Sequence, residues 1–138
     1  MQNTRLSYNN TIGVFNILPI GGAGGGLSNS SVAVLENVHL DNNTAGFRGG
    51  GMRGGINSTT EARNVASTNS TIEHGGGIYN GSRLTLTESK VTDNISFLAP
   101  GGIFNDGGQV TVDQKTVISG NRPTNCTPSS PPVPNCFG

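Results

Sequence analysis

The sequence predicts an all-β protein, a single-stranded, right-handed parallel β-helix (β-solenoid) of roughly four to five coils of about 26 residues. Two independent landmarks recur with this spacing. The first is a glycine run that ends on an apolar residue, and the second is an asparagine that follows an apolar residue at the third position. The apolar residues after the glycines are Leu27, Met52, Ile78 and Ile103, and the asparagines are Asn43, Asn69, Asn94 and Asn121.

Short alternating segments between the landmarks predict one strand per coil. They occupy residues 32–34, 58–60, 84–86 and 110–112, so successive segments keep a constant offset. Alternation with a period of two is typical of a strand, and we expect the first and third residue of each segment to face inward. No unit has the three-four apolar spacing of an amphipathic helix, so helical repeats are excluded. A coil built only from strands remains.

The composition favours such a coil over a thick apolar core. Of 138 residues, 32% are hydrophobic and 5% aromatic, and the formal net charge is zero. In stacked parallel strands, each backbone N–H and C=O pairs with the next coil, so few large side chains suffice. The basic residues are scattered, so no nucleic-acid partner is expected. No apolar run reaches about 18 residues, so we also expect no membrane insertion.

The recurring asparagines and glycines have distinct expected roles. Residues one period apart lie above one another, so Asn43, Asn69, Asn94 and Asn121 can form an internal amide ladder. Glycine fits sharp corners because they need either a positive φ or a close backbone approach.

The two ends of the chain differ from the repeats at residues 24–121. We expect residues 1–23 to form a partial N-terminal coil and a loop. Residues 122–138 hold five prolines, which suit a C-terminal cap or tail because proline cannot donate to a sheet. A disulfide between Cys126 and Cys136 would staple this segment and contribute roughly 2–3 kcal/mol. Such a bridge implies an oxidising, extracytoplasmic compartment, so the predicted location is secreted or at the cell surface.

Units such as Gly75-Gly76-Gly77-Ile78-Tyr79-Asn80, together with the apolar-x-x-Asn marks, resemble the repeats of chlamydial polymorphic outer-membrane proteins. They are also similar to the wider group of bacterial right-handed parallel β-helix repeat proteins. The similarity covers roughly residues 24–121. The resemblance implies a secreted or surface-displayed module, often adhesive, and does not imply an enzyme.

Three functions stay open. The first is a non-catalytic structural or adhesive surface module that contacts a glycan or a host-cell surface. The second is a carbohydrate-binding or carbohydrate-active β-helix of the pectin-lyase-like type. The third is a subunit that assembles end to end, as a homo-oligomer, through an open N-terminal coil.

Candidate ligand residues lie on the expected outward face. With the constant offset, Leu35, Glu61, Thr87 and Asp113 form one column, and Thr59, Thr85 and Thr111 form another. Glu61 and Asp113 would then stand two coils apart, roughly 10 Å, a marginal spacing for an inverting glycosidase. The outward candidates are Glu61, Thr85, Thr87, Thr111 and Asp113, with no catalytic residue, cofactor or metal site predicted.

Overall fold

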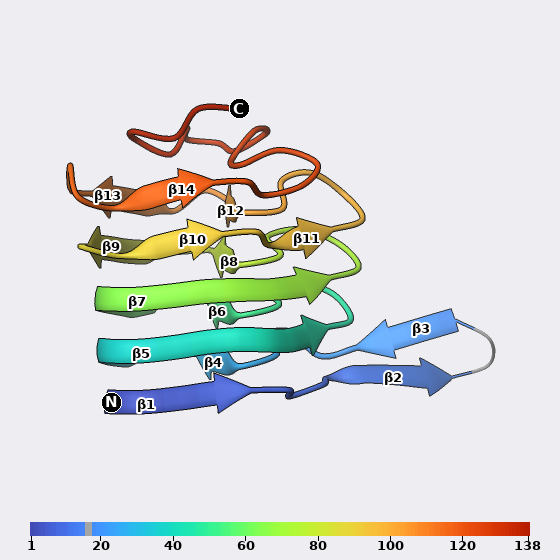
Figure 1. The fold of residues 1–138 in the computed structure, drawn as a ribbon. Helices are drawn as coiled ribbons and strands as arrows, with labels where there is room; N and C mark the ends of the chain where they lie inside the picture. Colours follow the sequence, from blue (N-terminus) through green and yellow to red (C-terminus); the bar gives the residue numbers. More distant parts are fainter. Residues whose placement is uncertain (16–17) are drawn as a thin grey trace.

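Parallel strands stacked turn upon turn form the computed structural model of the chain, which describes residues 1–15 and 18–138 (Figure 1). The predicted fold class is confirmed: this part of the chain is a parallel β-solenoid of about four turns of roughly 26 residues, without a helix. Its strands are β1 (Gln2–Ser7), β2 (Ile12–Phe15), β3 (Leu18–Gly21), β4 (Leu27–Asn29), β5 (Val32–Ala45), β6 (Met52–Gly54), β7 (Thr59–Thr71), β8 (Ile78–Asn80), β9 (Arg83–Thr87), β10 (Lys90–Thr92), β11 (Ile95–Ser96), β12 (Ile103–Asn105), β13 (Gln109–Val112) and β14 (Val117–Ser119).

Each turn contributes strands to three stacks. The first stack holds the first halves of β5 and β7, followed by β9 and β13. The second stack holds β1, the second halves of β5 and β7, β10 and β14. The third stack is a separate sheet in the order β4, β6, β8 and β12. Apolar side chains from all three stacks meet in one narrow core.

The segment before the first glycine run differs from the loop expected there. Strand β1 pairs in parallel with β5, which makes it part of a turn. Strands β2 and β3 then form an antiparallel hairpin, and Figure 1 shows it projecting sideways from the stacked turns. Residues 1–23 therefore combine a partial turn with a hairpin.

A buried column of asparagines runs through the solenoid. The side-chain Nδ2 of Asn43 donates to Oδ1 of Asn69 over 2.9 Å, and Nδ2 of Asn94 donates to Oδ1 of Asn121 over 2.8 Å. Between these pairs, the backbone N–H of Asn69 donates to Oδ1 of Asn94 over 2.6 Å. Two further residues extend the column at its ends, Asn9 and Asn125.

The column also serves the backbone. Nδ2 of Asn43, Asn69, Asn94 and Asn121 donates to a main-chain carbonyl of the preceding turn, at Leu6, Leu40, Ser67 and Val91 respectively. The amides of Asn43 and Asn94 therefore each join three successive turns. Because a buried polar group without a partner costs free energy, this arrangement makes burial of the asparagines favourable.

Each glycine run forms a corner of the solenoid, at which the backbones of successive turns lie in close contact. Gly49 has φ +65°, a left-handed conformation that other residues adopt at a cost. At Gly50 a Cβ atom would lie 2.0 Å from the carbonyl oxygen of Ser70 and 2.4 Å from that of Gly76. The first glycine therefore supplies the turn and the second supplies space for neighbouring backbone.

A second asparagine series lies outside, at the corner between the first and second stacks. Asn3, Asn37 and Asn64 have φ values of 48°, 52° and 50°. Nδ2 of Asn37 donates to Oδ1 of Asn3 over 3.0 Å, and Nδ2 of Asn64 donates to Oδ1 of Asn37 over 2.7 Å. In the next turn this corner is occupied by Glu88, with φ 51°.

The proline-rich segment closes the C-terminal end of the solenoid. Cys126 and Cys136 form a disulfide, and Cys126 and Val133 are buried in the core cluster. The backbone N–H of Ser130 donates to the carbonyl of Asn105 over 3.0 Å, so the cap pairs with the last strand of the third stack.

Replacing Asn94 by Leu should lower the free energy of unfolding by about 3 kcal/mol or more, because several buried partners lose their hydrogen bonds together. These partners include the N–H of Asn69 and the carbonyls of Ser67 and Thr92. Urea unfolding measures the change. The control Thr68→Val, on the exposed side of β7, should shift stability little. A loss below about 1 kcal/mol for Asn94→Leu would contradict the ladder's role.

Removing the disulfide with Cys126→Ala and Cys136→Ala should lower stability by about 2–3 kcal/mol, since a short loop is no longer closed in the unfolded chain. Thermal unfolding with and without a reductant tests this. The reductant should lower the melting temperature of the natural chain and leave that of the double variant unchanged. A natural chain insensitive to reductant would show that the bridge adds no stability.

Candidate functional site

The outward side of the first stack holds the candidate residues, and its register corrects the expected columns. Cα pairing places Glu61 between Val34 and Thr85, with Thr111 next to Thr85. Thr59 lies beside Arg83 instead of Thr85. Leu35 pairs with Ala62 and is buried, so the expected column of Leu35, Glu61, Thr87 and Asp113 does not exist.

A difference in the length of the loops that connect the strands explains the error. The connection from β6 to β7 is longer than the connection from β4 to β5, which shifts β7 along the stack. Val32 therefore pairs with Thr59 instead of Ser58, and the pairing of β7 with β9 is displaced in the opposite direction. The expected constant offset holds between β9 and β13, where Leu84 pairs with Val110.

The slip also changes which side chains face the core. Val32 and Val34 were expected inside, but they are 72% and 54% exposed. Leu84 and Leu86 in β9 and Val110 and Val112 in β13 are buried as expected. Because strand side chains alternate, a slip by a single position exchanges the two faces.

Three outward rows result, each crossing the stacked strands. The first row holds Val32, Thr59, Arg83 and Gln109, the middle row holds Val34, Glu61, Thr85 and Thr111, and the row toward the corner holds Glu36, Arg63 and Thr87. A shallow groove of about 300 Å³ follows these rows. Its lining residues, called the outer groove below, are Val34, Leu35, Glu36, Glu61, Ala62, Arg63, Thr85 and Thr87.

Several polar side chains on this face have no partner of their own. Within the part of the chain that the structure describes, the side chains of Glu61, Thr85 and Thr111 make no hydrogen bond or ion pair. Their carboxylate and hydroxyl groups are therefore open to a ligand, and exposed Val34 adds an apolar surface beside them.

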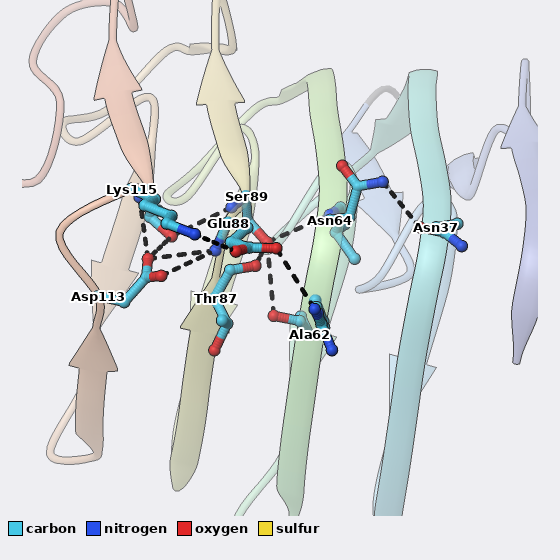
Figure 2. A network of polar contacts seen from close by, with 11 residues as sticks. Asn37, Ala62, Asn64, Thr87, Glu88, Ser89, Asp113 and Lys115 are labelled. Atoms are coloured by element: carbon cyan, nitrogen blue, oxygen red, sulfur yellow. Dashed lines mark hydrogen bonds and ion pairs between the residues drawn. The ribbon is translucent and has the colours of Figure 1, made fainter.

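Asp113 has a different environment. Figure 2 shows its carboxylate among residues of two successive turns. It accepts the backbone N–H of Glu88 over 3.1 Å, and its Oδ1 accepts the backbone N–H and the hydroxyl of Thr116 over 2.9 and 2.6 Å. These bonds support the left-handed corner at Glu88, a conformation that costs a non-glycine residue about 1–2 kcal/mol. Asp113 thus acts within the fold.

Charged neighbours surround the same corner (Figure 2). Nζ of Lys115 lies 2.6 Å from Oε1 of Glu88, and Nη2 of Arg63 lies 3.6 Å from Oε2. The hydrogen bond and charge of Lys115 lower the pKa of Glu88. The hydrogen bond from Thr116, with backbone N–H bonds, lowers the pKa of Asp113. Both carboxyls stay ionised, and exposed pairs of this kind contribute little stability.

The sequence did not single out Glu36 and Arg63 as candidate ligand residues, although they line the outer groove. The constant offset placed the wrong residues beside Glu61. The longer Gly55–Ser58 turn is visible in the sequence as extra residues between Gly54 and the next alternating segment, and counting them would have found the slip.

No metal centre is evident in residues 1–15 and 18–138, since no three His, Cys, Asp or Glu side chains gather closely enough to hold an ion. In the same residues, no helix has the length and apolar character needed to cross a bilayer. Comparisons with models of protein families, with curated proteins and with solved structures give no match to the chain.

Replacing Asp113 by Asn should make the fold less sensitive to acid. A carboxyl whose folded pKa is lowered adds stability above its unfolded pKa, about 3.9, and this is lost as the pH falls through the folded pKa. The urea midpoint, followed from about pH 5 down to about pH 2, should fall less in Asp113→Asn than in the natural chain. Glu61→Gln, which removes a carboxyl without internal bonds, should leave the acid loss unchanged. Equal acid loss in all three proteins would contradict the assignment.

Proposed function

We propose that the chain is a non-catalytic, extracytoplasmic surface module that adheres to a glycan chain through the outer groove and the adjoining Thr111. The observation that carries this proposal is the open row of Glu61, Thr85 and Thr111, whose polar groups have no internal partner in the described chain and lie on an exposed sheet. Sugar hydroxyls donate to carboxylates and exchange hydrogen bonds with threonine hydroxyls.

The scaffold supports a role in adhesion. The buried amide ladder and the coil-to-coil backbone bonds fix the strands, so the outward rows keep their spacing without a ligand. A preorganised surface loses less conformational entropy when it binds.

Two features support the extracytoplasmic location. The Cys126–Cys136 disulfide is stable in oxidising compartments. The glycine and asparagine marks resemble the repeats of chlamydial polymorphic outer-membrane proteins, which implies surface display.

The arrangement of carboxylates supports binding over hydrolysis. Glu61 and Asp113 belong to different outward rows, and Asp113 already accepts the N–H of Glu88 and both donors of Thr116. A glycosidase needs two carboxyl groups that face one bond, one as acid and one as base or nucleophile.

Binding of the labelled protein to immobilised glycans and to cell surfaces tests the proposal. The double variant Thr85→Val/Thr111→Val should lower the affinity for the best ligand at least about tenfold. Sugar hydroxyls buried in the complex would lose the threonine hydroxyls as hydrogen-bond partners. Glu61→Gln should act in the same direction.

The matched control is Thr68→Val/Thr92→Val, which removes two hydroxyls from the outward side of the second stack. It should bind as the natural chain does. The proposal fails if the natural chain binds neither glycans nor cells, if the control loses as much affinity, or if glycan cleavage depends on Glu61.

A further inference from the structure

A second concave site lies away from the outer groove, where the third stack meets the disulfide-closed cap. Its volume is about 240 Å³. One wall comes from β12 and the residue after it, and the other comes from the cap. We call it the cap notch, and its lining residues are Phe104, Asn105, Asp106, Pro128, Ser129 and Ser130.

The aromatic side chain of the cap notch is held in place by two neighbouring rings. Phe104 stacks on His74, with ring centroids 4.5 Å apart and planes inclined by 23°. Tyr79, its Cα partner in β8, lies with its ring centroid 5.7 Å away. Nδ1 of His74 lies 2.5 Å from the carbonyl of Ala99, which orients the imidazole. Phe104 is therefore a positioned ring that stays partly accessible.

The carboxylate of the cap notch is also positioned. The hydroxyl of Tyr79 donates to Oδ2 of Asp106, and Nη1 of Arg48 donates to the same hydroxyl over 3.1 Å. Burial of Tyr79, with this bond to Asp106, raises the pKa of Tyr79 to about 12, so the phenol remains a donor near neutral pH. Oδ1 of Asp106 accepts no hydrogen bond from other described residues.

The cap side of the notch supplies a hydroxyl and an apolar ring. Ser129 is engaged, since its Oγ accepts the N–H of Asn105 over 3.0 Å and donates to the carbonyl of Ile103. The side chain of Ser130 is exposed and makes no hydrogen bond within the described residues. Pro128 stands beside it.

We propose that the cap notch binds one ring of a neutral hexose. The C–H face of the sugar packs on Phe104, whose ring face is electron-rich. Two neighbouring sugar hydroxyls bond to Oδ1 of Asp106 and to the hydroxyl of Ser130, and a bond to a carboxylate is stronger than one between neutral groups. A sugar ring has an apolar C–H face and polar hydroxyls at its edge, and an aromatic ring beside a carboxylate provides a contact for each.

The charge of the cap notch selects against acidic sugars. Asp106 is the one charged residue in its lining, so a uronate would meet a like charge. The site shares no residue with the outer groove, so this inference stands independently of glycan binding there.

Nuclear magnetic resonance titration of the full chain with methyl glucoside, methyl galactoside and methyl mannoside tests the proposal, with methyl glucuronide as the acidic comparison. At millimolar concentrations, at least one neutral glycoside should shift the amide signals of residues 104–106 and 128–130. The glucuronide should shift them less. The proposal is overturned if no neutral glycoside shifts these signals, or if the glucuronide binds better.

Two variants with matched controls separate a binding role from a structural one. Asp106→Asn and Phe104→Leu should each lower the affinity about tenfold. Asp93→Asn and Tyr8→Leu remove an exposed carboxylate after β10 and an exposed ring at the far end of the solenoid, and both should bind normally.

The amide spectrum of each variant reports its fold. If Phe104→Leu unfolds, Asp106→Asn and the shift map of the natural chain decide the question. Undiminished sugar binding by Asp106→Asn would refute the proposal. The variant Thr85→Val/Thr111→Val on the outward side of the first stack should keep the hexose shifts at the cap notch, so failure of one site leaves the other testable.

Discussion

Satisfying buried polar groups is the constraint on which this fold depends. The chain has few large apolar residues, so backbone groups and asparagine amides fill space that apolar side chains fill in other proteins. In the described residues, every buried side-chain nitrogen or oxygen has a hydrogen-bond partner. Asn43 shows how this is achieved, because its amide bonds both to the turn below at Leu6 and to the turn above at Asn69. Within the column of Asn43, Asn69, Asn94 and Asn121, each asparagine bonds to another one turn away, which makes the repeat a physical requirement of this part of the core.

Asparagine has a second use at the surface, and the two uses have different chemical causes. Inside, the amide is needed as a donor and acceptor, as at Asn94. At the outer corner, Asn37 and Asn64 are tolerated in the left-handed region because asparagine enters it more readily than most residues. Glu88 lacks that tolerance, and in its turn the bonds from Asp113 hold the corner instead. A carboxylate in the following turn thus replaces an intrinsic backbone preference.

Sequence periodicity predicted the structural features that recur from turn to turn and missed the local irregularities that interrupt them. The stacking of Asn43 on Asn69, the inward Leu84 and Leu86, and the pairing of Cys126 with Cys136 all follow from spacing and residue type. The columns through Glu61 were wrong because the Gly55–Ser58 turn is longer and shifts β7 against both neighbours. The cap notch could not be predicted, since Phe104 and Pro128 meet only through the path of the cap.

One proposed site lies on the repeated strands, and the other lies where the repeats end at the cap. The row of Glu61, Thr85 and Thr111 presents hydrogen-bonding groups at the regular spacing of parallel strands, which suits a ligand that itself repeats, such as a polysaccharide. A ligand that shifts by one strand exchanges the hydroxyl of Thr85 for that of Thr111, so these two residues would give the proposed adhesion modest selectivity. The cap notch occurs once, where Asp106 after β12 and Ser130 of the cap lie side by side as paired neighbours. A ring that binds there has one register, and selectivity for a particular sugar therefore belongs at the end of the solenoid, where the repeat stops.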